Sequence, residues 1–282
     1  MSSLKDTVEA YVKSRLENYT PSLVRAPKVI HDTILGSNLF YPHEIAVLDI
    51  PLLQRLRRIN QVDVVPLVFP SGNHNRFEHT LGVAVISEKL IKALFARIDN
   101  LEEIGLERFN NTDLAFHYCL YHIRMAAIMH DCGHGPFSHM SEQVYRHFED
   151  LKEEKKTNPK LNGASPHEIL SYMIVTSVSF KNFFEKQIKP HYGVDLDLEI
   201  VGEIIVGYTG RLREAYIVEI INGGFDADKL DYIQRDSHFT GIKMVLDMPR
   251  LFYTIETLDI DGKLRLSVDL SGIATLEQIV FN

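Results

Sequence analysis

The sequence lacks the features that mark secreted, membrane-spanning or disulfide-stapled proteins. It has 282 residues but only two cysteines, Cys119 and Cys132, which form no CxxC motif. We interpret both as small core residues in a reducing compartment. The N-terminus has no apolar signal region, and no stretch is long and apolar enough to cross a bilayer. We therefore expect no membrane association and a cytoplasmic location, or a nuclear one in a eukaryote.

Positive charge is also scarce. Lys and Arg number 30 against 38 Asp and Glu, which gives a formal net charge of -8. This balance argues against a nonspecific nucleic-acid surface, but it leaves open a local basic pocket for a small phosphate ligand. The hydrophobic share of 45% allows a large core. No internal repeat or linker is visible, so we expect residues 1–282 to form a single domain.

Histidine, in contrast, is abundant, with 13 copies. Three of them lie in residues 130–139, which read HDCGHGPFSH. The apolar run before this motif predicts a buried helix that ends at His130 and Asp131, after which Gly133 stops it and Pro136 starts another. An adjacent imidazole and carboxylate suit a divalent ion. The alternative is a polar turn in which the histidines cap helix carbonyls.

The rest of the chain reads as mainly α-helical. Apolar spacing predicts helices over residues 4–16, 50–59, 76–97, 196–208 and 213–221. The proline-containing stretch 21–42 should be irregular or weakly extended, and the Lys/Glu-rich run 149–162 should be an exposed excursion. Alternation around Asp261-Gly262 predicts a small β-hairpin over 258–266. The chain ends within a predicted helix, so we expect a truncated C-terminus.

Four candidate metal ligands lie on three predicted helices: His79, the pair His130-Asp131, and Asp228. Two neutral imidazoles and two carboxylates would neutralise a dication and leave positions for water and a phosphate oxygen, as phosphoester hydrolysis requires. Taken singly, His79 could be a core histidine and Asp228 part of a solvated acidic face. Three nearby histidines would act as second-shell or acid/base residues: His134, His139 and His167. Arg76 and Lys229 are placed to hold phosphates.

The order His79, His130-Asp131, Asp228 resembles the H…HD…D signature of the HD superfamily of metal-dependent phosphohydrolases. The strings NRFEH at 75–79, HDCGHGPFSH at 130–139 and DKLDY at 228–232 are similar to its deoxynucleotide triphosphohydrolase branch. The resemblance covers residues 28–250. It implies an HD-type helical bundle with its core in that range. It also implies hydrolysis of deoxynucleoside triphosphates (dNTPs) by water attack at the α-phosphorus, which releases a deoxynucleoside and triphosphate.

The resemblance also implies roles for individual residues. The four ligands would hold iron, zinc, manganese or magnesium. His134 and His167 match catalytic histidines, and His139 matches an active-site partner. The resemblance implies that Arg76, Lys229 and Tyr232 contact the triphosphate. It also implies that Gln61 and Asp236 contact the sugar.

Members of this branch are homo-oligomers, dimers or tetramers, that GTP or dGTP activates between subunits. Five residues match the guanine-nucleotide site: Lys28, Val29, Asp49, Gln54 and Arg57. Two residues match an adjoining activator site: Asp247 and Arg250. His31 stands where the branch has an asparagine in the second activator pocket. Two other readings stay open: a nucleotide monophosphatase or phosphodiesterase with the same metal chemistry, and a non-catalytic nucleotide-sensing module.

Overall fold

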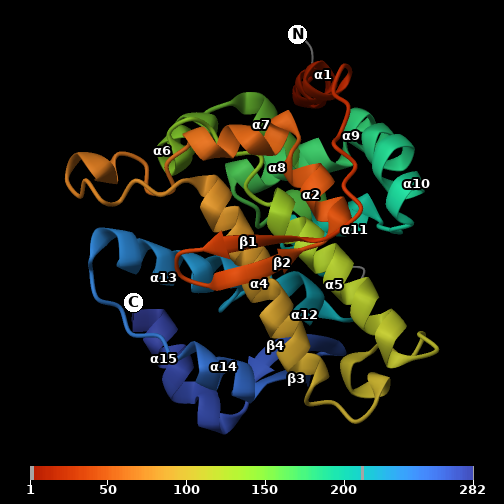
Figure 1. The fold of residues 1–282 in the computed structure, drawn as a ribbon, viewed down its shortest axis with the longest axis vertical. Coiled ribbons are helices and arrows are strands. Elements are labelled where there is room, and N and C mark those ends of the chain that lie inside the picture. Colours follow the sequence, from red (N-terminus) through yellow and green to blue (C-terminus); the bar gives the residue numbers. More distant parts are fainter. Residues whose placement is uncertain (1–2, 211–212, 282) are drawn as a thin grey trace.

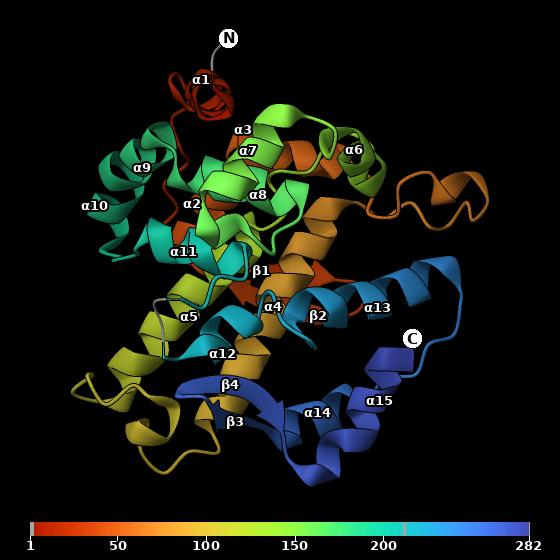
Figure 2. The same cartoon turned by 180° about the vertical axis from the view of Figure 1, so that it is seen from behind.

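The computed structural model describes residues 3–210 and 213–281 and is mainly α-helical, as the sequence predicts (Figures 1 and 2). The first half of the chain contains α1 (Leu4–Leu16), β1 (Lys28–Asp32), β2 (Gly36–Phe40), α2 (Pro42–Leu48), α3 (Pro51–Gln54), α4 (Arg76–Phe95), α5 (Thr112–Met129) and α6 (Ser138–Tyr145). The second half contains α7 (Glu149–Thr157), α8 (Pro166–Thr176), α9 (Val178–Phe183), α10 (Lys189–Tyr192), α11 (Leu198–Ile205), α12 (Ala215–Glu219), α13 (Ala227–Thr240), α14 (Met248–Thr254), β3 (Ile255–Ile260), β4 (Lys263–Val268) and α15 (Ile273–Phe281). Short 3-10 turns at 55–58, 65–67, 101–104, 159–161 and 270–272 and a π-helical turn at 184–188 connect them.

Helices α4 and α5 form the centre of the molecule, and α13 and α11 pack against them (Figure 1). In α5 nearly every side chain from Cys119 to Met129 is buried, because this helix is covered on all sides. Its end, where His130 and Asp131 follow, is therefore fixed deep in the core. In the part of the chain that the structure describes, no helix is long and apolar enough to span a membrane.

A hairpin of β1 and β2 occupies the stretch for which irregular or weakly extended backbone is expected. The strands pair antiparallel from Lys28 opposite Phe40 to Asp32 opposite Gly36. Oδ1 of Asp32 accepts hydrogen bonds from the backbone N–H groups of Ile34 and Leu35, and Gly36 has a φ of 75°. The turn therefore depends on an aspartate that bonds to its own backbone and on a glycine in the left-handed region.

The charged run 149–162 is largely exposed, as predicted, but it is also helical, which its pattern did not predict. It forms α7 and a 3-10 turn, and Leu151 and Leu161 are buried. Glutamate and lysine are good helix formers, and two apolar anchors suffice to dock such a segment. Pro136 also differs from expectation: it precedes the next helix, because α6 starts at Ser138.

The predicted C-terminal hairpin is confirmed. Strands β3 and β4 pair from Ile255 opposite Val268 to Ile260 opposite Lys263. Asp261 and Gly262 both have positive φ, at 53° and 77°, as a two-residue hairpin turn requires.

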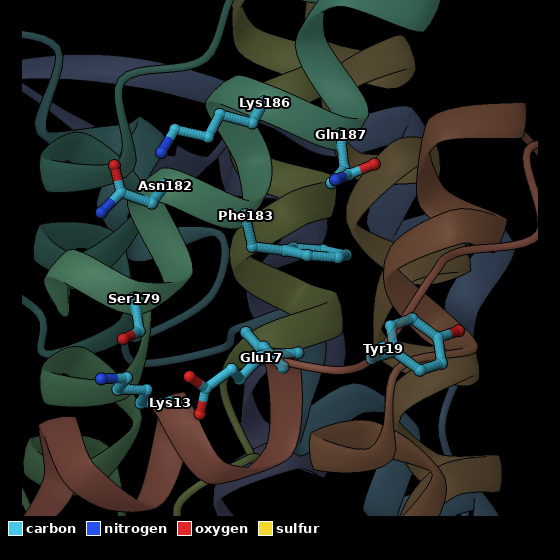
Figure 3. Close-up of a pocket in the computed structure, with 9 residues that line it drawn as sticks. Lys13, Glu17, Tyr19, Ser179, Asn182, Phe183, Lys186 and Gln187 are labelled. Carbon is cyan, nitrogen blue, oxygen red and sulfur yellow. The ribbon is translucent and has the colours of Figure 1, made fainter.

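The N-terminal helix α1 is tied to α9. Glu9 accepts hydrogen bonds from the backbone N–H groups of Val178 and Ser179, the first two residues of α9. The rings of Tyr19 and Phe183 lie 6.2 Å apart at the edge of a surface hollow between α1 and the segment that follows Ser177 (Figure 3). This contact holds the start of the chain against the helical body.

Candidate metal centre and active site

The four predicted metal ligands lie together, at the meeting point of three helices. His79 comes from the start of α4, His130 and Asp131 from the end of α5, and Asp228 from the first turn of α13. Nε2 of His79 is 2.8 Å from Oδ1 of Asp228, and Nε2 of His130 is 3.8 Å from the same oxygen. Nε2 of His130 also lies 3.4 Å from Oδ1 of Asp131. Asp228 is the only one of the four with a substantially exposed side chain, 37%, so the cluster opens to solvent on its side.

The turn after α5 is held in place by α8. Nδ1 of His130 donates to the carbonyl of Ala127 at 2.7 Å. The hydroxyl of Ser171 donates to the His130 carbonyl and accepts from the backbone N–H of Gly133. A Cβ on Gly133 would lie 2.2 Å from the carbonyl oxygen of His167, so only glycine allows this approach. The turn thus fixes the direction of the His130 ring.

The donor atoms of both ligand histidines fit a divalent cation. Nε2 of His79 and Nε2 of His130 are buried, and within the described residues neither makes a hydrogen bond. The close approach of Asp228 to His79 therefore lacks hydrogen-bond geometry. Buried polar atoms without partners are costly, and two imidazole nitrogens beside two carboxylates are the donors of an open, catalytic metal site.

The electrostatics of the cluster agree with this donor set. Burial opposes a positive charge on His79, but the carboxylates of Asp228 and Asp231 outweigh it and raise its pKa to about 10. Burial also opposes ionisation of Asp131, yet Arg76 and the adjacent histidines hold its pKa well below the usual range. For Asp228, His79 outweighs burial and lowers the pKa of the carboxyl. The carboxylates are therefore ionised and attract a cation.

A chain of buried charges supports His79 from behind. Nδ1 of His79 lies 2.8 Å from Oδ2 of Asp231. Arg235 donates to both oxygens of Asp231, from Nε at 2.7 Å and from Nη2 at 2.9 Å, and its Nη1 is 2.9 Å from Oδ2 of Asp32 in β1. A Cβ on Gly82 would lie 1.9 Å from Oδ1 of Asp231, so glycine leaves the room that this chain needs. Because Asp231 holds the proton on Nδ1 of His79, Nε2 is the nitrogen that would lose its proton to a bound metal ion.

The three predicted catalytic histidines form a second cluster beside the first. The rings of His134 and His167 stack with centroids 3.9 Å apart, and His139 meets His134 edge-on at 5.2 Å. Nδ1 of His167 is 2.5 Å from Oε1 of Glu142, and Nδ1 of His139 is 3.2 Å from the same oxygen. Nε2 of His134 lies 3.3 Å from Oδ1 of Asp131, which connects the two clusters.

The stacked histidines differ in basicity. Burial lowers the pKa of His134 to about 3, although Asp131 opposes this effect. Burial also acts to lower the pKa of His167, but its bond to Glu142 outweighs burial and raises it. The same contacts lower the pKa of Glu142 against the effect of burial. One histidine therefore favours the neutral form and its neighbour the protonated form, as a proton-transfer site requires.

The predicted phosphate-binding cations are already engaged within the protein. Arg76 is buried, donating from Nη1 to Oδ2 of Asp131 at 2.7 Å and from Nε to the hydroxyl of Ser138 at 2.6 Å. Its observed contact therefore orients a predicted metal ligand. Lys229 donates to Asp226, the N-cap of α13, and to the carbonyl of Gly223. Their contacts with a triphosphate stay predictions.

Of the other predicted substrate residues, Tyr232 and Asp236 lie on α13, and Gln61 lies in the segment before α4. Oδ1 of Asp236 is 2.8 Å from Nε2 of His74, whose ring stacks on Phe239. Gln61 is buried, and its side-chain oxygen has no hydrogen-bond partner within the described residues. Tyr232 is half-buried. Their assigned roles at the sugar and triphosphate stay predictions.

The predicted activator residues are split between two places. Lys28 and Val29 are exposed on β1, and Asp49, Gln54 and Arg57 follow along α2, α3 and the 3-10 turn. In that turn, Arg57 donates to Oε1 of Gln54 at 2.9 Å and covers the ring of Phe77 at 3.8 Å. At the other place, Asp247 caps α14 and Arg250 donates to the carbonyl of Ser271. Their role in nucleotide binding stays a prediction.

Three residues of the site were given no role in it by the sequence alone: Asp231, Glu142 and His74. The signal for Asp231 is Arg235 four residues later, a spacing that places the two side chains together on one helix face. Glu142 lies three residues after His139, which places it on the same helical face. His74 has no such signal, because its partner Asp236 is brought to it only by the fold.

A family model of the HD domain matches residues 76–236, which is more than half of the chain and includes all four clustered ligands. The chain belongs to the HD domain family. Curated relatives include "Deoxynucleoside triphosphate triphosphohydrolase SAMHD1" from Bos taurus, 31% identical over 83% of this chain and 39% of the relative. The SAMHD1 protein from Homo sapiens is 31% identical over 90% of this chain and 40% of the relative. "Uncharacterized protein MJ1154" of Methanocaldococcus jannaschii is 29% identical over 90% of this HD-family chain and 43% of the relative. The chain thus spans about two fifths of each.

Proposed function

We propose that this HD-family chain hydrolyses deoxynucleoside triphosphates to deoxynucleosides and triphosphate with a divalent metal ion. One observation carries the proposal: two buried imidazole nitrogens, without hydrogen-bond partners among the described residues, lie beside two carboxylates at a solvent-accessible point. The substrate class is supported by the printed names of the SAMHD1 relatives. The identity of the metal, among iron, zinc, manganese and magnesium, is left to experiment.

His79, His130, Asp131 and Asp228 would hold the ion. When bound, such an ion polarises a phosphoryl oxygen and lowers the pKa of coordinated water. Arg76 positions Asp131 through its 2.7 Å hydrogen bond. The chain's own contribution to this part of the site is to keep four donors in place within the core.

Proton transfer in the proposed reaction falls to the second cluster. Glu142 holds Nδ1 of His167 at 2.5 Å, which leaves Nε2 of His167 to carry a proton. We assign this proton to the leaving 5′-oxygen of the deoxynucleoside. His134 stacks on His167, and we assign it, with the more exposed His139, to contacts with the α-phosphate. Hydrolysis needs such an acid because an unprotonated alkoxide is a poor leaving group.

The finer parts of the proposal concern substrate and activator binding. We assign Lys229 and Tyr232 to the triphosphate and Gln61 and Asp236 to the sugar. Activation by GTP or dGTP, and assembly into a homo-oligomer, are part of the same proposal. The exposure of Lys28 and Val29 on β1 is compatible with binding between subunits.

Product analysis tests the proposal. Each of the four dNTPs is incubated with the protein and Mn²⁺ or Mg²⁺, with and without GTP, and the products are separated by ion chromatography. We expect intact triphosphate and the deoxynucleoside. Orthophosphate or a nucleoside monophosphate as the first product would instead identify another type of phosphohydrolase. Activity that survives changing both His130→Ala and Asp131→Ala would refute the site.

A further inference from the structure

A second pocket is lined by aromatic rings that come from the start of α2, from α5 and from α10. Its volume is about 480 Å³, which is within the usual range of 300–1,000 Å³ for small-molecule sites. Six of its lining residues are aromatic or cationic: Arg25, Tyr41, His43, Tyr121, His191 and Tyr192. Among the residues that the structure describes, no carboxylate lines this pocket. The lining therefore favours a ligand with a ring and a negative charge.

Three of these rings form a packed wall. His43 lies nearly parallel to Tyr41, with centroids 6.0 Å apart, and edge-on to Tyr121 at 5.2 Å. Tyr41 and Tyr121 meet edge-on at 6.3 Å. Because the wall is built from α2 and α5, both fixed by the core, its faces are held in position for stacking.

One polar group beside the wall lacks a partner. The hydroxyl of Tyr192, which also lines the pocket, is buried and has no hydrogen-bond partner in the described part of the chain. A buried donor or acceptor without a partner is destabilising, and a polar ligand would satisfy it.

We propose that this pocket binds a planar aromatic anion, with the ring against the Tyr41–His43–Tyr121 wall and the anionic group near Arg25. A nucleoside monophosphate and an aromatic carboxylate share this chemistry. The hollow beside α1 (Figure 3) is a contrast: Lys13, Glu17 and Lys186 give its lining both charge signs, so it selects no such class.

Isothermal titration of the whole chain with four probes tests the proposal. AMP carries a ring and an anion, ribose 5-phosphate only the anion, adenosine only the ring, and indole-3-acetate a ring with a carboxylate. We expect AMP or indole-3-acetate to bind at least about tenfold more tightly than ribose 5-phosphate and adenosine. The better of the two identifies the source of the anion. Equal affinity for all four probes would overturn the proposal.

Variants assign the binding to the pocket. Arg25→Gln, an exposed position, should weaken binding about tenfold, and Tyr192→Phe, which keeps the ring, about fivefold. Lys186→Gln in the other hollow is the matched control and should have no effect. The double change His130→Ala with Asp131→Ala should leave this binding intact, because neither residue lines the pocket. Loss of binding in that double variant, or no effect of Arg25→Gln, would place the ligand elsewhere and refute the pocket.

Discussion

Replacing Gly82 with alanine is the sharpest test of the Asp231–Arg235 pair that supports His79. The substitution has two opposite effects on the stability of the protein. Gly82 lies within the long helix α4, where alanine normally stabilises by about 1 kcal/mol relative to glycine. Here an added Cβ would lie 1.9 Å from Oδ1 of Asp231 and 2.4 Å from Nη2 of Arg235. The methyl group must push this buried ion pair apart.

The magnitudes decide the sign. Disrupting a buried ion pair costs about 3–5 kcal/mol. Subtracting the gain of about 1 kcal/mol in helix propensity leaves a net loss of at least about 2 kcal/mol for Gly82→Ala. For a protein of this size, such a loss lowers the midpoint of thermal unfolding by roughly 4–8 °C. Because Asp231 orients His79, metal affinity should also fall by about 10–100-fold.

Two measurements on the same variant separate the site from general instability. Thermal unfolding by circular dichroism gives the midpoint, and competition with a fluorescent chelator gives the affinity for Zn²⁺ or Mn²⁺. Gly202→Ala is the matched control: its Cβ would lie 2.8 Å from Cδ2 of Tyr172 in α8, away from the metal cluster. It should lower the midpoint but leave metal affinity unchanged. A Gly82→Ala protein that is more stable than the parent, or that binds metal equally well, would refute the reasoning.

Three further outcomes are expected. Glu142→Gln removes the anion beside His167 and should lower kcat for dNTP hydrolysis by about 10²-fold with little change in KM, as read from initial rates; an unchanged kcat would exclude the pair from proton transfer. Asp32→Asn keeps an acceptor for the backbone of the β1–β2 turn but loses the charge facing Arg235, so the free energy of unfolding in urea should fall by about 1–2 kcal/mol, whereas a change within error would show the tether to be dispensable. A divalent ion at a hundredfold excess over its Kd should stabilise the chain by about 2.7 kcal/mol in thermal unfolding, an effect that EDTA reverses; a chain with His130 and Asp131 both changed to alanine should not respond.

The sequence by itself determined the local features of this protein. The apolar run before His130 predicts the buried helix α5, and Asp261-Gly262 makes the hairpin turn. These features depend on side chains within a few residues of one another, so their pattern is visible without the fold. The H…HD…D order identified the family for the same reason, because it is a property of the chain.

The tertiary structure alone decided which groups meet. Asp231 in α13 contacts His79 in α4, and Glu142 in α6 contacts His167 in α8. The direction of Arg76, towards Asp131, is likewise set by the packing of α4 against the turn after α5. Such contacts join residues that are far apart in the chain, and their geometry is fixed only when the core closes around them. Sequence thus named the donors, and packing set their distances, their charges and their partners.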